Sequence, residues 1–447
     1  MSRLFGTDGV RGLANRELTP ELAFDLGRAA GTVLGRGGRP RFLVGQDPRR
    51  SSGMLEAALV AGLASVGADV ERLGVVTTPG LAFLVREAGA SAAAMVSASH
   101  NPAEYNGIKF FSAEGFKLPD AVEDEIEALL RGGGELPRAE GEALGAVAGA
   151  EERTERYVDF LAGSVPEGAL AGLPLAVDCA NGAASRIAPA VLKRLGARLT
   201  VLHAEPDGLN INRGSGSLHP EALARAVRET GAWAGLAFDG DADRCIAVDE
   251  EGNVLDGDQI LAVLAMARRR QGRLPGGTVV GTVMSNLGLE RALAAMGLRL
   301  LRTRVGDRYV LEAMLREGCL LGGEPSGHVI LRDLHTTGDG ILTGLQLLAA
   351  ARELGAPLSE LARSVPKLPQ VQLNVPVAAR DGLEENPRIA RAREEVERSL
   401  AGRGRLVLRS SGTEPVVRVM VEAEVEEEAR AAAERLARVV EQELRGR

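Results

Sequence analysis

The chain has 447 residues, which is enough for two to four domains of ordinary size. Hydrophobic residues make up 45% of the sequence and charged residues 26%, as in soluble globular proteins, so extensive disorder is excluded. The 53 basic and 61 acidic residues give a net charge of −8, which argues against a general nucleic-acid or membrane-surface binder.

No signal peptide or membrane span is visible in the sequence. The N-terminal segment lacks an apolar stretch, and the longest apolar run, Ile260–Ala267, is far shorter than the roughly 18 residues of a membrane span. We therefore expect a cytoplasmic protein. The three cysteines, which are too few and too scattered for a disulfide framework or a zinc site, are expected to be small core residues: Cys179, Cys245 and Cys319.

Short β-branched runs predict buried strands of an α/β sheet at 41–45, 173–178 and 279–283. Each strand is followed by a helical pattern that stops at a glycine, the residue that favours the left-handed conformation after a helix: Gly67, Gly196 and Gly297. The same order of strand, helix, glycine and strand occurs three times, roughly 100 to 130 residues apart. The sequence therefore predicts three related α/β domains with mixed sheets.

Breaks in this pattern place the domain boundaries. The stretch 132–150 and the proline-containing segment 365–376 predict linkers, and a turn at 250–253 separates the second unit from the third. Strands at 406–408 and 416–421 and a charged helix at 426–444 predict a smaller C-terminal α+β domain. The predicted domains are 1–150, 151–252, 253–366 and 367–447.

Three carboxylates occupy alternate positions of the segment 239–244 (DGDADR): Asp239, Asp241 and Asp243. Carboxylates this close repel one another unless a cation lies among them, and oxygen donors without His or Cys favour Mg²⁺ or Ca²⁺. A calcium-binding EF-hand does not fit, because Arg244 replaces the glycine at its sixth position and because strands flank the segment. A solvated acidic turn remains the alternative.

The segment 97–102 (SASHNP) follows a small-residue strand at 92–96 and places Ser99 and His100 on a loop constrained by Pro102. A serine beside a histidine is a possible nucleophile. The sequence has no GxSxG elbow, however, so a hydrolase is a weak interpretation. Lys109 follows closely as one of only four lysines, and a surface lysine is its alternative interpretation.

Two further loops carry polar groups. The segment 322–328 offers the carboxylate, hydroxyl and imidazole of Glu324, Ser326 and His328, which suit a polyhydroxylated ligand, and His328 can act as acid or base. The segment 409–418 offers two arginines, hydroxyls and backbone N–H groups that can hold a phosphate dianion. The sequence contains no GxxxxGK[ST] phosphate loop, the motif of nucleotide-triphosphate sites. The N-terminal segment 6–12 is another small-residue loop and carries Arg11.

Together, ASHNP (98–102), DGDADR (239–244), GEPSGH (323–328) and RSSGTEP (409–415) resemble the four signature loops of the α-D-phosphohexomutases. They occur in the order of that family, one in each predicted domain, and the resemblance covers essentially the whole chain. The segments FGTDGVRG, VMSNLGLE, VGDRYVLE and TTGDG are similar to those of bacterial members that interconvert glucosamine 6-phosphate and glucosamine 1-phosphate. That reaction lies on the route to UDP-N-acetylglucosamine and peptidoglycan.

The resemblance implies an active site at the centre of the four domains. Ser99 would carry a phosphoryl group and, with the three aspartates, hold one Mg²⁺; glucosamine 1,6-bisphosphate would be the intermediate. Arg11, Lys109 and Arg244 would neutralise the transferring group, with Lys109 and His328 as proton-transfer candidates. Glu324 and Ser326 would hold the sugar. The other phosphate would be bound by Arg409, Ser411, Gly412, Thr413 and Arg418.

The expected partner is a small sugar phosphate, without nucleic acid or membrane, and the expected state is a monomer or homodimer. Two alternatives stay open: the same chemistry on a mannose or glucose phosphate, and a catalytically silent sugar-phosphate-binding protein. Retention of Ser99 and all three aspartates argues against the silent protein. Pro325 fills a loop position that varies between family branches and helps to set the sugar preference, and Ser410 and Ser52 depart from the usual Pro and Gly.

Overall fold

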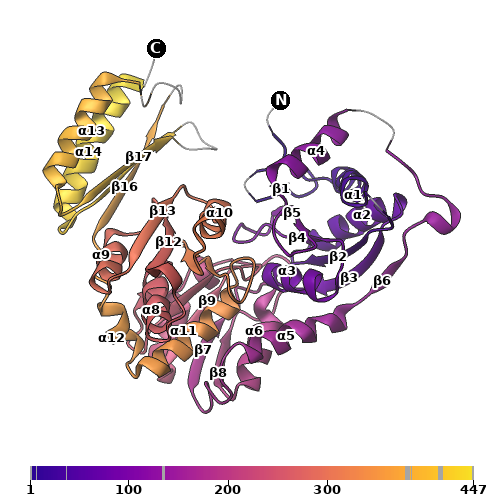
Figure 1. Cartoon of the computed structure of the whole chain (residues 1–447), viewed down its shortest axis with the longest axis horizontal. Coiled ribbons are helices and arrows are strands. Elements are labelled where there is room, and N and C mark those ends of the chain that lie inside the picture. The colour runs from indigo at the N-terminus through magenta and orange to yellow at the C-terminus, as the bar shows by residue number, and fades with distance from the viewer. Residues whose placement is uncertain are drawn as a thin grey trace.

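The computed structural model describes residues 3–6, 8–36, 38–132, 136–377, 383, 385–410 and 416–444. These residues form four units, each built on one β-sheet, that follow one another along the chain (Figure 1). No helix in these ranges is both long enough and apolar enough to cross a bilayer.

The first unit contains a six-stranded sheet of order β1-β5-β4-β2-β3-β6. The central strands are parallel, and β5 runs antiparallel to β4 and β1. The strands are β1 Val10–Leu13, β2 Arg41–Gln46, β3 Asp69–Val75, β4 Ala92–Val96, β5 Tyr105–Ser112 and β6 Val147–Gly149. The helices are α1 Pro20–Leu34, α2 Ser52–Ser65, α3 Thr78–Glu87 and α4 Asp120–Arg131.

The second unit has a five-stranded sheet of order β11-β10-β9-β7-β8. Its elements are α5 Thr154–Gly163, β7 Pro174–Asp178, α6 Ala184–Arg194, β8 Arg198–Leu202, α7 Glu221–Thr230, β9 Ala234–Phe238, β10 Cys245–Val248 and β11 Val254–Leu255.

The third unit has a four-stranded sheet of order β13-β12-β14-β15. Its elements are α8 Gly257–Arg270, β12 Thr278–Thr282, α9 Leu287–Ala295, β13 Arg299–Thr303, α10 Asp307–Glu317, β14 Leu321–Gly323, β15 Val329–Leu331, α11 Gly340–Leu354 and α12 Leu358–Arg363.

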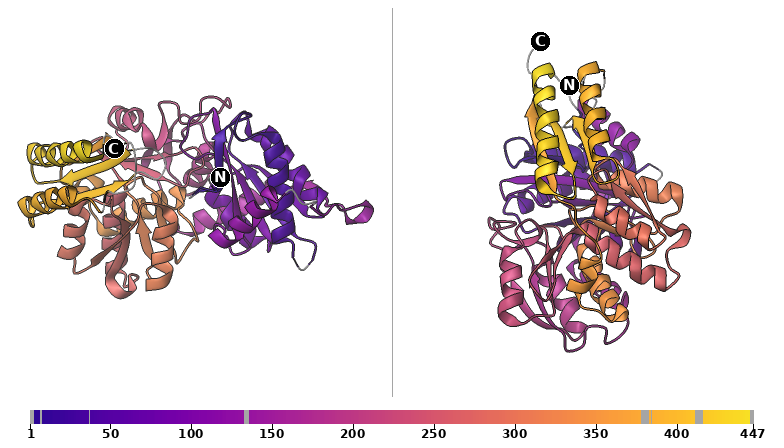
Figure 2. Two further views of the ribbon diagram at one scale, coloured as in Figure 1. Left: turned by 90° about the horizontal axis from the view of Figure 1, so that it is seen from above. Right: turned by 90° about the vertical axis from the view of Figure 1, so that its left-hand side faces the viewer.

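The fourth unit is smaller and differs in topology. Its antiparallel sheet has the order β16-β18-β17, and its elements are β16 Gln370–Pro376, α13 Pro387–Leu400, β17 Arg405–Ser410, β18 Val416–Glu422 and α14 Glu426–Leu444. It lies against the third unit, beside α9, and apart from the first unit (Figures 1 and 2). The largest apolar core continues through the first three units, whereas the fourth unit has a core of its own.

The mixed sheets and the smaller C-terminal unit confirm the predicted fold class. β2, β7 and β12 form where strands were predicted, and each terminating glycine adopts a positive φ, +88° at Gly67, +85° at Gly196 and +68° at Gly297. Two predicted linkers were partly wrong: the stretch 132–150 contributes β6, which pairs in parallel with β3, and the segment 365–376 contributes β16. Both form edge strands, which need fewer apolar residues than a central strand.

The first three sheets share one feature that positions the functional loops. In each sheet a strand of the parallel set is joined by one loop to an antiparallel neighbour: β4 to β5, β9 to β10 and β14 to β15. The three connecting loops are 97–104, 239–244 and 324–328. Ligands of open α/β sheets bind beyond the carboxyl ends of the parallel strands, so these loops are equivalent places for binding groups.

Candidate active site where three units meet

The loop after β4 orients the Ser99 hydroxyl. Ser97 Oγ donates a hydrogen bond to Asp47 Oδ2 at 2.7 Å and accepts one from the Ser99 N–H at 2.9 Å. Ser99 has a φ of +52°, a conformation that non-glycine residues adopt rarely. Its side chain therefore points toward the second unit, where Ser99 Oγ donates to Asp239 Oδ2 at 2.8 Å. The two serines thus have different roles: Ser97 anchors the loop, and Ser99 faces the aspartates.

The backbone of this loop is held from both units. The buried Arg49 guanidinium donates to the carbonyl oxygens of Ser99 and Asn101 at 2.9 and 2.8 Å. Asn212 Nδ2, from the second unit, donates to the same two oxygens at 2.9 and 3.0 Å. A Cβ at Gly240 would lie 2.5 Å from the Ser99 carbonyl oxygen, so only glycine permits this approach. The Ser99 loop is therefore fixed against the 239–244 loop.

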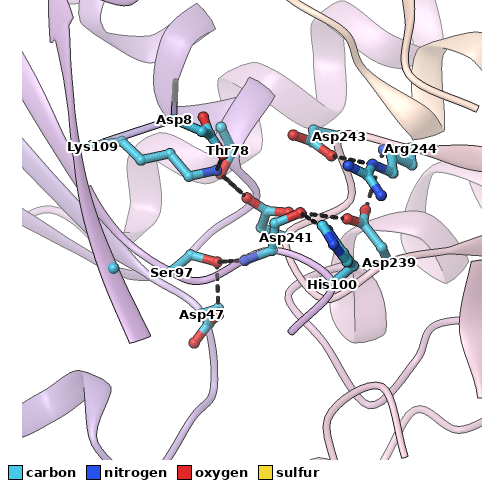
Figure 3. A network of polar contacts seen from close by, with 12 residues as sticks. Asp8, Asp47, Thr78, Ser97, His100, Lys109, Asp239, Asp241, Asp243 and Arg244 are labelled. Atoms are coloured by element: carbon cyan, nitrogen blue, oxygen red, sulfur yellow. Dashed lines mark hydrogen bonds and ion pairs between the residues drawn. The ribbon is translucent and has the colours of Figure 1, made fainter. Parts of the chain in front are cut away.

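Asp239, Asp241 and Asp243 are buried, and one oxygen from each lies within 4.8 Å of the others (Figure 3). Burial raises the pKa of Asp239 well above its ordinary value, and the neighbouring carboxylates Asp243 and Asp241 raise it further. One oxygen of Asp241 and one of Asp243 are buried without a hydrogen-bond partner. Buried carboxylates that repel one another, two of them with an oxygen left without a partner, fit a hard divalent cation such as Mg²⁺.

Lys109, on β5, reaches the aspartates from the first unit. Its Nζ lies 2.8 Å from Asp241 Oδ2 and 3.2 Å from Asp8 Oδ2, and Thr78 Oγ1 donates to the same Asp241 oxygen at 2.6 Å. Burial alone would lower the pKa of Lys109, but Asp241 and Asp8 outweigh it, so the pKa is raised. The ammonium therefore keeps its proton, which suits charge neutralisation (Figure 3).

A chain of charges connects this lysine to the third unit. Asp8 pairs with Arg11, Lys109 and Lys117, and Lys117 Nζ also lies 2.5 Å from Asp307 Oδ2 at the start of α10. Burial would raise the pKa of Asp8, but the three cations hold it well below its ordinary value. Alternating, partly buried charges thus join Arg11 to Asp307 across two units.

Arg244 and His100 border the aspartates. The backbone N–H of Arg244 donates to Asp239 Oδ1 at 3.2 Å, and the guanidinium Nε of Arg244 lies 3.8 Å from Asp243 Oδ1. Burial lowers the pKa of His100 to about 4, and the nearby guanidiniums of Arg244 and Arg11 add to this effect. The imidazole is therefore neutral at physiological pH, and its Nδ1 lies 3.4 Å from the Ser99 hydroxyl.

The loop of the third unit contributes His328. Its Nδ1 lies 3.6 Å from Asp243 Oδ2, and its Nε2 lies 3.8 Å from Asp307 Oδ2. Burial would lower the pKa of His328, but the two carboxylates, chiefly Asp243, raise it above the ordinary value. The two carboxylates thus favour the protonated form of this imidazole. On the same loop, Glu324 Oε1 accepts the N–H of Gly306 at 3.0 Å and Ser326 is exposed.

The predicted phosphate-binding residues belong to the fourth unit. Arg409 on β17 and Arg418 on β18 lie directly opposite each other in the sheet. Partial burial lowers the pKa of Arg409, and the charge of Arg418 lowers it further. Ser411, Gly412 and Thr413 lie outside the described residues. The structure therefore brings together the site residues of the first three units, while the two arginines lie on the neighbouring fourth unit.

Several contributors had no role assigned from the sequence. Asp8 and Asp307 lie in the motifs FGTDGVRG and VGDRYVLE, whose conspicuous composition is the only sequence feature that points to them. Arg49, Thr78 and Asn212 act through contacts between residues distant in the chain, which spacing alone does not reveal.

Family models match all four units of the chain. The models describe phosphoglucomutase/phosphomannomutase alpha/beta/alpha domains I, II and III, over residues 2–136, 155–252 and 256–368, and the C-terminal domain, over 373–439. The phosphoglucosamine mutase of Moorella thermoacetica is 56% identical over 430 residues, which cover 96% of this chain and 97% of that protein. Other relatives, 50 to 56% identical, carry the same description.

Solved structures share the whole fold. A phosphoglucomutase/phosphomannomutase family protein from Burkholderia thailandensis has a TM-score of 0.81 and 26% identity, over 99% of this chain and 98% of that one. N-acetylphosphoglucosamine mutase of Aspergillus fumigatus, solved with GlcNAc-6P and magnesium, has a TM-score of 0.71 and 19% identity, over 98% and 95%. The chain therefore belongs to the phosphoglucomutase/phosphomannomutase family, the α-D-phosphohexomutases, and is a mutase of the isomerase class.

Proposed function

We propose that the enzyme interconverts glucosamine 6-phosphate and glucosamine 1-phosphate, with Ser99 as the phosphoryl carrier. The observation that carries this proposal is the Ser99 hydroxyl, which is buried and donates to Asp239 beside two further carboxylates. A binding protein needs neither that hydroxyl nor that cluster. The relatives at 50 to 56% identity support glucosamine as the sugar.

The reaction is two phosphoryl transfers. In the first, a sugar hydroxyl attacks the phosphorus of phosphoserine, a new O–P bond forms, the P–Oγ bond to Ser99 breaks, and the hydroxyl proton ends on the released Ser99 oxygen. The product is glucosamine 1,6-bisphosphate. After the bisphosphate turns around, Ser99 Oγ attacks its other phosphorus, a new Oγ–P bond forms, the P–O bond to that sugar oxygen breaks, and the serine proton ends on the released sugar oxygen. Such transfers depend mainly on alignment and charge neutralisation.

The described residues suit these steps. Lys109, Arg11 and Arg244 supply positive charge around Ser99, and the raised pKa of Lys109 keeps its charge in place. His328, whose pKa is also raised, holds the proton to be exchanged with the sugar oxygen. A Mg²⁺ ion bound by Asp239, Asp241, Asp243 and a phosphoserine oxygen would further neutralise the phosphoryl charge. The magnesium in the Aspergillus structure supports this assignment.

Substrate binding is assigned to the third and fourth units. Glu324 and Ser326 bind sugar hydroxyls, and the phosphate that does not react binds to Arg409, Ser411, Gly412, Thr413 and Arg418. The proposed domains are 1–150, 151–252, 253–366 and 367–447, and the proposed compartment is the cytoplasm.

The decisive experiment compares kcat/KM for glucosamine 6-phosphate, glucose 6-phosphate and mannose 6-phosphate at equal concentrations. We expect glucosamine 6-phosphate to be preferred over glucose 6-phosphate by at least about tenfold, or roughly 1.4 kcal/mol in transition-state binding. One carboxylate or carbonyl that faces the ammonium group provides that much. Equal values, or a preference for mannose, would assign the chain to another branch of the family.

A further inference from the structure

The segment 283–290 (VMSNLGLE) has no part in the site described above. Its first four residues connect β12 to α9, and the others form the first turn of α9. A Cβ at Gly288 would lie 1.9 Å from the carbonyl oxygen of Pro366, so the two segments contact each other backbone to backbone. This contact places VMSNLGLE at the connection between the units.

Asn286 holds that connection through its side-chain amide. Nδ2 donates to the Leu368 carbonyl oxygen at 3.0 Å, and Oδ1 accepts the Leu368 N–H at 3.0 Å. Asn286 is buried, and its Oδ1 also accepts the N–H of Gly288 at 2.9 Å as the N-cap of α9. An amide that bonds both backbone groups of one residue fixes the direction of the chain there. Leu368 lies two residues before β16, the first strand of the fourth unit.

A second set of contacts comes from the strands of the fourth unit. The Arg405 guanidinium, on β17, donates to the carbonyl oxygens of Val283 and Ser285 at 2.9 and 2.7 Å. Arg405 also pairs at 2.9 Å with Glu422 of β18, which is fully buried. Glu422 in turn accepts the N–H of Leu287 at 2.9 Å, at the N-terminus of α9, where the helix dipole favours a carboxylate.

The same segment is connected to the sugar loop. The Asn286 N–H donates to Asp258 Oδ2 at 2.7 Å, in the first turn of α8. The neighbouring Gly257 N–H donates to the carbonyl oxygen of Pro325 at 3.0 Å. A Cβ at Gly257 would lie 2.0 Å from the Glu324 carbonyl oxygen, so the sugar loop packs directly on the start of α8. A cavity of roughly 620 Å³ beside this junction is lined by Asp258, Pro325 and Leu368, among others.

We infer that Asn286 and the Arg405–Glu422 pair are positioning residues, which hold the phosphate-binding unit in register with the sugar loop. This inference rests on the proposed function, in which a bisphosphate turns around between two transfers. The fourth unit must then loosen its hold on one phosphate without losing the intermediate. Removal of the contacts at Asn286 leaves the chemistry at Ser99 intact and allows the bisphosphate to escape.

The variant Asn286→Ser isolates the positioning role. Serine is as good a helix N-cap as asparagine, but it is too short and lacks the amide needed to bond both groups of Leu368. Asn386→Ser is the matched control, because Asn386 caps α13 within the fourth unit and its side-chain bonds stay within that unit. A second variant, Arg405→Lys, keeps the charge beside Glu422 and cannot donate to both carbonyls in the same geometry.

The first readout is free glucosamine 1,6-bisphosphate during turnover, measured by ³¹P NMR. We expect Asn286→Ser to release about tenfold more of it than wild type. A tenfold change corresponds to the loss of two hydrogen bonds of modest strength. Turnover falls and is restored by added bisphosphate, because each escape leaves Ser99 without its phosphoryl group and the phosphate content of Ser99 falls during turnover. If release and turnover match those of Asn386→Ser, the positioning role is refuted.

The second readout does not depend on catalysis. Hydrogen exchange of the peptide that contains Leu368 should accelerate about tenfold in Asn286→Ser and in Arg405→Lys, and not in Asn386→Ser. Unchanged exchange would also refute the inference. If exchange accelerates but wild type does not convert glucosamine 6-phosphate, the proposed function fails while the connection is as described. The two failures are therefore distinguishable.

Discussion

The centre around Ser99 and the fourth unit are built differently. At the centre, Ser99, Lys109, Asp239 and Asp241 are almost fully buried, and contacts between units fix each of them. In the fourth unit every residue of β17, which carries Arg409, is half-buried, and its apolar core is separate. The groups around Ser99 are thus held by contacts between units, while the proposed second phosphate site lies on a unit with a core of its own.

The strongest test of the rigid centre replaces its nucleophile. Ser99→Ala removes the oxygen that carries the phosphoryl group, so turnover should fall by several orders of magnitude while sugar phosphate still binds. Ser97→Ala should lose only about tenfold, because it removes a hydrogen bond to the Ser99 N–H. Mass spectrometry should show an increase of about 80 Da, one phosphoryl group, on Ser99 and not on Ser97. Phosphate on Ser97 would overturn the mechanism.

The second test removes the cation. Activity should disappear in EDTA, return with Mg²⁺ and stay low with Ca²⁺, whose longer bonds and looser coordination misplace the phosphoryl group. Asp241→Asn should lower kcat on the order of 10³-fold, because one of three converging carboxylates is lost. Steady-state kinetics with and without metal measure both effects. Full activity in metal-free buffer would exclude a metal site.

The third test addresses the proposed phosphate site of the fourth unit. Arg409→Ala should raise KM about tenfold to a hundredfold, since a hydrogen bond to a charged phosphate contributes roughly 1.5 to 3 kcal/mol. Its effect on kcat at saturating substrate should be much smaller. Arg403→Ala, which removes an exposed ion pair with Glu428 in the same unit, is the control and should leave KM unchanged. A KM unaffected by Arg409→Ala would remove this arginine from the phosphate site.

The smallest expected effect concerns pH and the junction between the third and fourth units. Burial, and then Asp256, raises the pKa of Asp258 to about 7, against about 3.9 in an unfolded chain. The folded state therefore binds the proton more tightly, and stability falls as pH rises from about 4 to about 7. Asp258→Asn keeps an acceptor for the Asn286 N–H but cannot ionise, so it removes this loss of stability with rising pH. The Tm of the variant should therefore differ less between pH 5 and pH 8 than the Tm of wild type. Asp207→Asn, at an exposed carboxylate, should retain the wild-type difference; an unchanged difference in Asp258→Asn would refute the burial argument.

Local rules were sufficient for much of the fold. Gly67, Gly196 and Gly297 end helices because their backbone adopts a conformation that other residues avoid, and this is visible in sequence. β6 and β16 were missed because edge strands pair with only one neighbour and tolerate glycine, proline and charge. α13 was missed because it is rich in charge, and its apolar side becomes apparent only against the sheet.

The aspartate cluster, by contrast, could be predicted from the sequence, since three carboxylates within five residues follow an apolar strand and lie on one loop. The pairing of Lys117 with Asp307 and the grip of Asn212 on the Ser99 loop could not, because they join residues far apart in the chain. Their geometry depends on how whole units pack. The segment 283–290 illustrates the same limit, because its composition was conspicuous while its contacts with Leu368 and Arg405 exist only in the assembled chain.

The burial of the Ser99 loop also limits how the enzyme is first activated. A protein kinase must draw its target serine into its own cleft as an exposed, extended segment. Ser99 is only 1% exposed, and its carbonyl oxygen is held by Arg49 and Asn212. Extraction of this loop would break the contact between two units. We therefore expect the first phosphoryl group to come from a small donor that diffuses into the folded centre, so a newly made chain can become active without a dedicated protein partner.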